Sequence, residues 1–437
     1  MAFNGGYWTV YNKEMGAFIN FKTDDKTGIL LSERGTVALP MVLNWGKDNE
    51  IFKVSQEEFK TNSLSIFGYD YMASELKNIR EVFLNATEVL FYKINGDGVK
   101  ATGGIATAKY SGVRGNDLKY TISANIDDET KFDVKTYLKT VLIDEQLNLS
   151  TPADLVDNDF IVFDKTGESF EETTQVLSGG TNGSEITGLN YQTVLEKFES
   201  KKFNVLICDA TDDTIKALFS TYTQRVRDEQ GIKFQTVIHK YEKADYEGVV
   251  SVENETKDGT NKNELVYWLG GLLAGCEVNK SCTNQKYTGE YEVDVDYKQT
   301  ELNNSIDTGK FMFHQVEDEI KTFSDINTFV SFTDEKNKFF AKNQVIRVFD
   351  QIANDIAKTF YTRYLGKVPT DKDGCSALWS DLDTYFKQLE TMRAIQNFSN
   401  KELSVVQVEG EKDSVKVDVI VQPTCAMEKL YMTVVVK

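Results

Sequence analysis

Residues 203–239, FNVLICDATDDTIKALFSTYTQRVRDEQGIKFQTVIH, decide the fold. The stretch opens with an apolar strand, Phe203 to Cys208, and returns with a second, Ile232 to Ile238. Between the strands lies an amphipathic helix, which Asp212 or Asp213 can cap. A strand, a helix and a strand within about 30 residues have the size of a βαβ unit. We therefore predict two parallel strands joined by a right-handed crossover.

The same alternation of helices and strands continues toward the C-terminus. Period and length predict these elements: a helix over 264–274, a half-buried strand over 291–297 with an acidic outer face, a longest helix over about 339–365, a helix over about 376–390, and strands over 415–421 and 430–436. On the N-terminal side, 74–83 reads as a helix and 89–92 as a buried strand. Pro40 restricts a strand within 28–44 to a sheet edge or a strand end.

Residues 95–184 differ from both flanks. Glycines crowd Gly96 to Gly115, alternating strands follow, and a turn-rich junction closes the segment at Gly179 to Ser184. We read this segment as a small β-rich domain inserted into a larger one. The expected class is a multidomain α/β (α+β) protein, divided into an N-terminal arm (1–22), a first core part (23–94), the insert as an outer domain (95–184), a second core part (185–402) and C-terminal strands (403–437).

Composition limits the classes of function. The 437 residues are 41% hydrophobic and 12% aromatic, which supports sizeable cores. The net charge of −19 repels phosphate backbones and anionic lipid, so neither a nucleic acid nor a membrane is an expected partner. The odd number of cysteines, five, predicts free thiols in a reducing compartment. We expect no secretion signal, no membrane span and a cytoplasmic site of synthesis.

Residues that could carry chemistry are few and scattered. The only histidines, His239 and His314, are far apart, so each is interpreted as a satisfied structural side chain. Cys276 and Cys282 have no second pair downstream, so a zinc site is not expected.

Two further patterns are also given structural interpretations. The glycine cluster lacks the spacing of a phosphate loop and is read as a hairpin; it comprises Gly96, Gly98, Gly103 and Gly104. Adjacent carboxylates are read as caps or solvated faces; these are Asp24-Asp25, Asp127-Asp128 and Asp212-Asp213. No catalytic, cofactor-binding or metal-binding residue is predicted.

The two chain ends are the exception, because each reads as a short strand beyond the core elements. Such a strand leaves its backbone donors and acceptors open unless it pairs within its own chain or with another chain. The pattern alone leaves both possibilities open. The candidates for pairing between subunits are Gly16, Phe18, Ile19, Phe21, Leu430, Met432, Val434 and Val436.

A resemblance favours pairing between chains. The segments that carry it follow one another along nearly the whole chain: GGYWT (5–9), NK (12–13), GAFINF (16–21), ERGTVALP (33–40), LNWG (43–46), AKYSGVRGND (108–117), YWLGGLLAG (267–275), INTF (326–329), NQVIR (343–347) and MEKLYMTVVV (427–436). In this order they resemble contractile-tail sheath proteins from phages, defective prophages and R-type bacteriocins of Gram-positive type. One difference stands out: Glu14-Met15-Gly16 occupies the place where the family often has Arg-Pro-Gly.

The resemblance implies a structural protein and not an enzyme. It implies hexameric rings around a tail tube, terminal strands exchanged between subunits, and contraction that drives the tube through an envelope without a cofactor. The implied partners are further copies, the tube protein, and baseplate and tail terminator proteins, in a virion tail or tail-like particle assembled in a bacterial cytoplasm. The alternatives are a tube or baseplate protein of the same machine, or a metal-dependent α/β enzyme with an acidic site in the βαβ unit.

Overall fold

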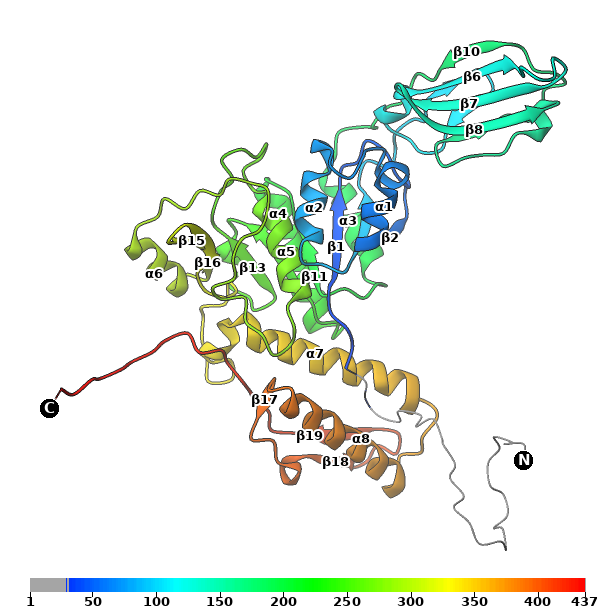
Figure 1. Cartoon of the computed structure of the whole chain (residues 1–437). Coiled ribbons are helices and arrows are strands. Elements are labelled where there is room, and N and C mark those ends of the chain that lie inside the picture. Colours follow the sequence, from blue (N-terminus) through cyan, green and yellow to red (C-terminus); the bar gives the residue numbers. More distant parts are fainter. Residues whose placement is uncertain (1–28, 30, 437) are drawn as a thin grey trace, which may run out of the picture.

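A seven-stranded sheet forms the centre of the molecule. The computed structural model describes residue 29 and residues 31–436. The strand order is β14-β13-β12-β11-β1-β3-β2, and every pair is parallel except β2 with β3. The bounds are β1 Thr36–Met41, β2 Ile51–Ser55, β3 Glu88–Lys93, β11 Val205–Ile207, β12 Gln235–His239, β13 Val249–Val252 and β14 Lys310–Phe311. This sheet confirms the expected α/β core (Figure 1).

The predicted βαβ unit is β11, α4 (Asp213–Asp228) and β12, and its two strands are parallel. Of the two candidate caps, Asp212 takes the role: its Oδ1 accepts from the backbone N–H groups of Thr214 (2.8 Å) and Ile215 (3.2 Å). The helix buries Phe219, Tyr222 and Val226 against the sheet. The structure confirms this prediction. The prediction was possible because the helix cap and the apolar stripe can both be recognised in the sequence.

Helices cover both faces of the sheet. One face carries α3 (Gly188–Phe198) and α4, and the other carries α1 (Gln56–Phe67), α2 (Lys77–Phe83) and α5 (Leu265–Gly275). Every residue of α5 from Leu265 to Ala274 is buried. Aromatic rings cover its outer side, with Trp268 packed on Tyr287 (5.1 Å between centroids) and Phe313 (5.6 Å). The helix is therefore an internal support of the core.

One helix was missed and two expectations need correction. Helix α1 was not expected, although Ser55 and Glu58 form a capping box at its start. Pro40 lies near the end of β1, which is a central strand, so the strand-end reading is right and the sheet-edge reading is wrong. Residues 291–297 alternate in burial, but they make only one bridge, between Thr256 and Val293, and no strand.

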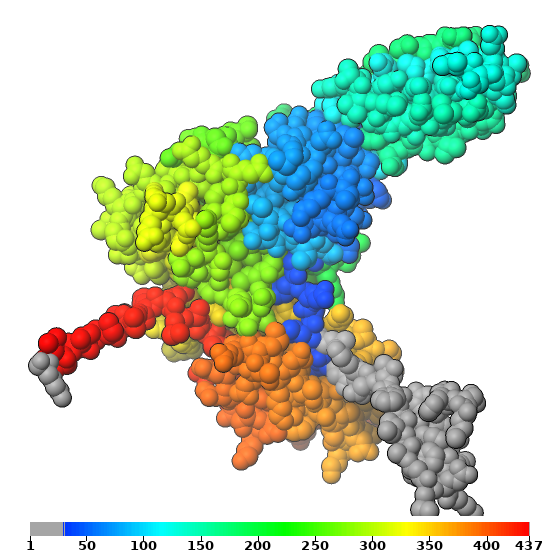
Figure 2. Space-filling view, in the orientation of Figure 1, coloured from blue at the N-terminus to red at the C-terminus, as the bar shows by residue number. Residues whose placement is uncertain are grey.

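The glycine-rich region is a β-sandwich that projects from one end of the core (Figures 1 and 2). One sheet has the order β10-β6-β7-β8 and the other β4-β5-β9, around a shared apolar core. The bounds are β4 Thr102–Gly103, β5 Ala106–Ala108, β6 Leu118–Ala124, β7 Phe132–Leu138, β8 Val141–Leu149, β9 Ile161–Phe163 and β10 Thr173–Val176. Lys93, buried at the junction, donates to Asp48 Oδ1 (2.8 Å) and to the carbonyl (2.7 Å) and hydroxyl (2.8 Å) of Ser111. Its charge is paired, so the junction holds a satisfied polar network.

The chain then forms small accessory elements beside the sheet. A helical C-terminal region follows and lies below the sheet in the view of Figure 1. The remaining bounds are α6 Gln299–Asp307, β15 Phe313–Val316, β16 Glu319–Thr322, α7 Asn343–Thr359, α8 Lys372–Thr391, β17 Ile395–Gln396, β18 Ser404–Gln407, β19 Val415–Asp418 and β20 Gln422–Pro423. A π-helical turn, Phe360–Tyr364, extends α7. Both long helices are confirmed: α7 and its π-helical turn together run from Asn343 to Tyr364 as the longest described helix, and α8 has 20 residues. Among the described helices, none has the length and apolar character needed to cross a membrane.

Candidate assembly interface

The C-terminal region has its own apolar core between α7 and α8. Val348 of α7 and Leu382, Tyr385 and Phe386 of α8 are fully buried there. The N-terminal segment, residue 29 and residues 31–35, joins the same core, because Ile29 is 4% exposed and packs within it. Ser32 then hydrogen-bonds to α7, its Oγ donating to Asp355 Oδ1 (2.5 Å). The N-terminal segment is therefore anchored in the C-terminal region before it enters β1.

A two-stranded sheet lies on α8 and has open edges. Strands β18 and β19 pair antiparallel, from Ser404 opposite Asp418 to Gln407 opposite Val415. In the described part of the chain neither strand pairs with a third. The hairpin shows apolar side chains to solvent, with Val406 48% exposed. An open edge of this kind can accept a further strand.

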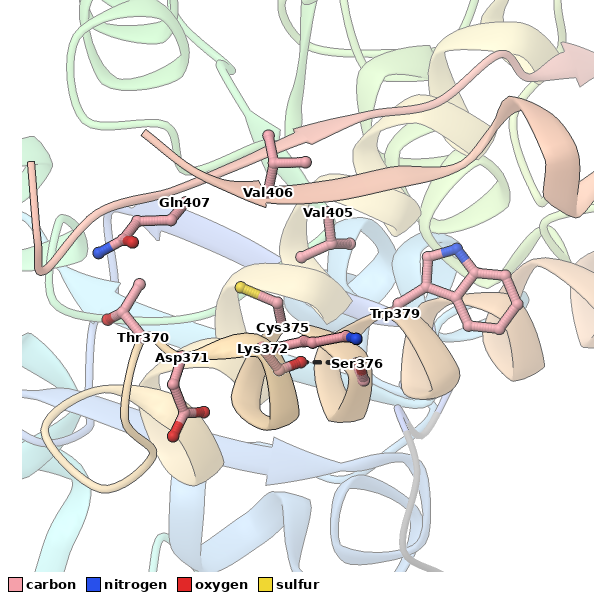
Figure 3. A pocket seen from close by; sticks show the side chains of 9 residues that line it. All are labelled: Thr370, Asp371, Lys372, Cys375, Ser376, Trp379, Val405, Val406 and Gln407. Carbon is pink, nitrogen blue, oxygen red and sulfur yellow. Dashed lines mark hydrogen bonds between the residues drawn. The ribbon is translucent and has the colours of Figure 1, made fainter. Parts of the chain in front are cut away.

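A groove of about 400 Å³ runs between β18 and the N-terminal half of α8 (Figure 3). The indole of Trp379 forms one end, and its Nε1 donates to the carbonyl of Leu403 (3.0 Å). Val405 and Cys375 supply apolar surface between the strand and the helix. The lining residues are Thr370, Asp371, Lys372, Cys375, Ser376, Trp379, Val405, Val406 and Gln407.

The C-terminal segment is anchored at its start. After β20, the N–H of Thr424 donates to the carbonyl of Ala394 (2.9 Å), and that of Ala426 to Gln344 Oε1 (2.9 Å). Glu428 then accepts from Thr283 Oγ1 (3.0 Å) and pairs with Lys342. These contacts attach the segment to the core and to α7, and Glu428 is the last of them.

Beyond Glu428 the chain leaves the body and extends into solvent (Figures 1 and 2). Residues 429–436 form no strand with any other described residue. Most of their side chains are nonetheless apolar and exposed, for example Leu430 at 85%, Val434 at 70% and Val436 at 90%. Exposed apolar surface on an extended segment is typical of an interaction site.

The structure thus places half of the predicted pairing residues. Leu430, Met432, Val434 and Val436 lie together on the extended segment. The N-terminal candidates, Gly16, Phe18, Ile19 and Phe21, lie outside the described residues. Sequence reasoning missed the groove and the anchor, in particular Trp379, Gln344 and Glu428. A short valine-rich run on each side of Gly410 was the available signal for the hairpin.

The two histidines lie in different places and form no common site. His239 ends β12 and is buried, and its Nε2 has no hydrogen-bond partner among the described residues. The interpretation as a fully satisfied histidine is therefore wrong at Nε2. Burial, with the nearby charges of Lys240 and Lys216, lowers the pKa of His239 to about 4. His314 lies on β15 against Phe323.

Carboxylates at the carboxyl end of β11 are already engaged. Asp213 pairs with Lys216 (3.4 Å) and Lys243 (3.0 Å), and Asp212 caps α4. Burial raises the pKa of Asp209 to about 6, and its Oδ2 accepts from the hydroxyl of Tyr267 (3.0 Å). Within residues 31–436, no cluster of three or more His, Cys, Asp or Glu side chains has a metal-binding arrangement.

Comparison with known families accounts for this arrangement. Family models match consecutive parts of the chain: the tail sheath protein Gp18 domain III N-terminal region (34–94), the phage tail sheath beta-sandwich domain (96–182), the central domain (184–328) and the C-terminal domain (335–437). These matches define a sheath protein of a contractile tail. The chain belongs to the phage tail sheath family.

Individual relatives match this chain over nearly the full length of both proteins. The phage-like element PBSX protein XkdK of Bacillus subtilis (strain 168) is 30% identical over 469 residues, covering 99% of both chains. The crystal structure of a sheath tail protein from Desulfitobacterium hafniense is 35% identical, with a TM-score of 0.81 over 95% of this chain and 99% of that one. The helical sheath of the anti-feeding prophage in its contracted state is 11% identical, with a TM-score of 0.54 over 97% and 99% of the two chains, and so shares the fold.

Proposed function

We propose that this chain polymerises as hexameric rings around a tail tube and contracts to drive that tube through the envelope of a target cell. The observation that carries the proposal is the exposed apolar segment 429–436, which leaves the body with no strand partner among the described residues. A tube or baseplate role is less well supported, because the matched family models describe sheath domains. The anti-feeding prophage structure of similar fold is a contracted helical sheath.

Pairing between subunits would join the exposed segment to an open strand edge. The β18–β19 hairpin of a second copy offers two such edges and the groove beside Trp379. Leu430, Met432, Val434 and Val436 would form one strand of the completed sheet. Gly16, Phe18, Ile19 and Phe21 would form another, from a different neighbour.

The expected energy of this strand pairing is large enough to keep neighbouring subunits connected while their cores move relative to one another. About six inter-chain backbone hydrogen bonds contribute about 1 kcal/mol each, and burial of the apolar side chains adds to this. The polar outer surfaces of the cores can meanwhile exchange contacts between two packings. Contraction then releases energy stored at assembly, so the chain needs neither a cofactor nor catalysis.

The proposed location is a phage tail or phage-tail-like particle, assembled in the cytoplasm of the bacterial host. The proposed partners are further copies of the chain, the tube protein, and baseplate and tail terminator proteins. The net charge of −19 argues against nucleic acid and anionic membranes as partners.

Deletion of residues 1–21 or of residues 430–437 tests the proposal. Each truncated chain is expected to be a soluble, folded monomer that forms no ordered sheath in electron micrographs. A sharper test uses neighbouring positions on the C-terminal segment: Val434→Lys should abolish assembly, whereas Thr433→Lys, on the opposite face of the strand, should permit it. Normal sheaths from both deletions would contradict the proposal.

A further inference from the structure

Two thiols with no role in the proposed interface lie together below α5. All five cysteines carry free thiols, and Cys208 is buried in the core far along the chain from this pair. Cys276 directly follows α5, its N–H donating to the carbonyl of Leu272 (2.9 Å), and its side chain is half-buried. Cys282 is fully buried. One thiol is therefore accessible to a small reagent and the other is protected behind it.

The intervening loop already holds the two sulfur atoms in position. The N–H of Lys280 donates to the carbonyl of Glu277 (3.0 Å), which turns the chain back toward α5. Asn279 Nδ2 donates to the carbonyl of Met392 (2.8 Å), and the N–H of Cys282 donates to Asp325 Oδ2 (2.9 Å). Cys276 Sγ lies 3.6 Å from the carbonyl oxygen of Lys280, and Arg347 contacts both that carbonyl and Cys282 Sγ. The loop therefore holds both thiols close to the Lys280 carbonyl and the Arg347 guanidinium.

Two buried arginines surround the pair. Arg347 of α7 donates through Nη1 to the carbonyl of Lys280 (2.8 Å) and through Nη2 to Cys282 Sγ (3.5 Å). Arg34 donates through Nε to the carbonyl of Cys276 (3.0 Å). The neighbouring Cys282 side chain and the charge of Arg347 lower the pKa of Cys276 to about 7, although burial and the carboxylate of Asp325 oppose them. The neighbouring Cys276 side chain, burial and Asp325 raise the pKa of Cys282 well above its ordinary value.

This difference in pKa suits Cys276 as the attacking thiol and Cys282 as the resolving thiol. The thiolate is the nucleophile in disulfide exchange, and a guanidinium beside a thiol increases the fraction of thiolate near neutral pH. We propose that Cys276 and Cys282 are a reversible redox pair that closes an intrachain disulfide when the protein meets a small disulfide such as oxidised glutathione.

The exchange balances in two steps. The Cys276 thiolate attacks one sulfur of the small disulfide, forming a mixed disulfide and releasing one small thiolate. Cys282 then attacks Cys276 Sγ, which breaks the mixed bond and releases the second small thiolate. The two protons of the protein thiols end on the small thiols, so two protein thiols are oxidised and one small disulfide is reduced to two thiols.

The bond would close a loop next to the C-terminal anchor. Thr283, which follows Cys282, donates to Glu428, and Asn279 within the loop contacts Met392. Oxidation would therefore fix the surface from which the C-terminal segment departs. The chemistry itself requires only the folded monomer, so its failure would leave the proposed sheath function untouched.

Thiol counting on a simplified chain tests the proposal. The variant Cys375→Ser/Cys425→Ser keeps Cys208, Cys276 and Cys282. After treatment with oxidised glutathione and denaturation, we expect one remaining free thiol, and peptide mapping should join Cys276 to Cys282. Adding Cys276→Ser to the same background should leave both remaining thiols free. Three free thiols in the parent variant, or a bond that involves Cys208, would overturn the proposal.

The pH dependence of alkylation provides a second measurement. Iodoacetamide should modify Cys276 with a midpoint near pH 7 in the folded parent variant. Cys282→Ala removes the neighbouring thiol and should move this midpoint to higher pH. An unchanged midpoint in that variant would show that Cys282 does not activate Cys276.

Discussion

At the scale of single residues, one buried ion pair joins the α/β core to the C-terminal helices. Arg227 of α4 donates to both carboxylate oxygens of Asp350 on α7, at 2.7 and 2.8 Å. The side chains of Arg227 and Asp350 are 4% and 8% exposed, so water cannot solvate either charged group. Removing one member leaves the other charge buried without compensation.

Asp350→Asn should therefore destabilise the protein strongly. We expect a loss of about 3–5 kcal/mol in the free energy of unfolding, measured by urea denaturation. The matched control is Asp418→Asn, which removes a partner of Lys416 in an exposed pair and should cost less than about 1 kcal/mol. Equal effects of the two substitutions would contradict the structural role of the Arg227–Asp350 pair.

His239 predicts a dependence of stability on pH. Its pKa is about 4 in the folded chain, below the ordinary value of 6.5, because burial disfavours the imidazolium. The stability that it contributes is fully present above pH 6.5 and is lost as the pH falls toward 4. At pH 5 the loss amounts to about 2 kcal/mol. His239→Gln should lack this component, so the stability difference between variant and wild type should change between pH 7 and pH 5. A constant difference would contradict it.

At the scale of elements, α2 and α5 approach each other at glycines. A Cβ on Gly271 would lie 2.3 Å from the carbonyl oxygen of Val82, and one on Gly275 would lie 2.1 Å from that of Asn85. Both obstacles are backbone atoms, which cannot turn aside. The GGLLAG sequence of α5 therefore permits close helix packing and not flexibility.

Gly271→Ala should destabilise the core, although alanine favours helices more than glycine does. We expect a loss of about 1–3 kcal/mol from overpacking, seen as a lower urea midpoint. Gly188→Ala is the control, because its Cβ would meet only the side chain of Ile215, at 3.7 Å. That substitution at the start of α3 should be neutral or slightly stabilising, and a similar loss at both positions would refute the packing argument.

The elements with strong local signals were predictable from the sequence. Unit β11–α4–β12 has an apolar strand, an aspartate cap and a stripe of period 3.6, and all three survive in the structure. Helix α1 was missed because its apolar positions are diluted by serine, threonine and asparagine. The capping box at Ser55 was the better signal.

Elements decided by long-range contacts were not predictable. The side chains of residues 291–297 alternate in burial as those of a strand do. These residues nevertheless form irregular backbone that packs over α5 and α2, and the hydroxyl of Tyr291 donates to Asn78 Oδ1 (2.5 Å). Burial by a helix produces the same alternation as burial by a sheet. The groove beside Trp379 and the anchor at Glu428 each combine segments distant in sequence, so no local pattern could indicate them. The apolar C-terminal segment was visible because its apolar residues lie within seven consecutive positions.

At the scale of the whole molecule, charge opposes assembly before contacts form. Each copy carries a net charge of −19, so copies that approach through acidic surfaces repel each other. The screening length is about 30 Å at 0.01 M salt and about 8 Å at 0.15 M. The proposed strand pairing would consist of backbone hydrogen bonds and apolar burial, which are far less sensitive to salt. Moderate salt should therefore weaken the repulsion more than the attraction.

Polymerisation of the purified chain should accordingly increase with sodium chloride between about 0.01 and 0.15 M. Light scattering would follow the amount of polymer, and electron micrographs would distinguish ordered sheaths from aggregates. The chain without residues 430–437 has the same acidic cores, so salt should relieve its repulsion equally and yet produce no ordered sheath. If salt instead dissolved the sheaths, ion pairs between subunits and not strand pairing would dominate the contacts, because only attractions between opposite charges weaken with screening over this range.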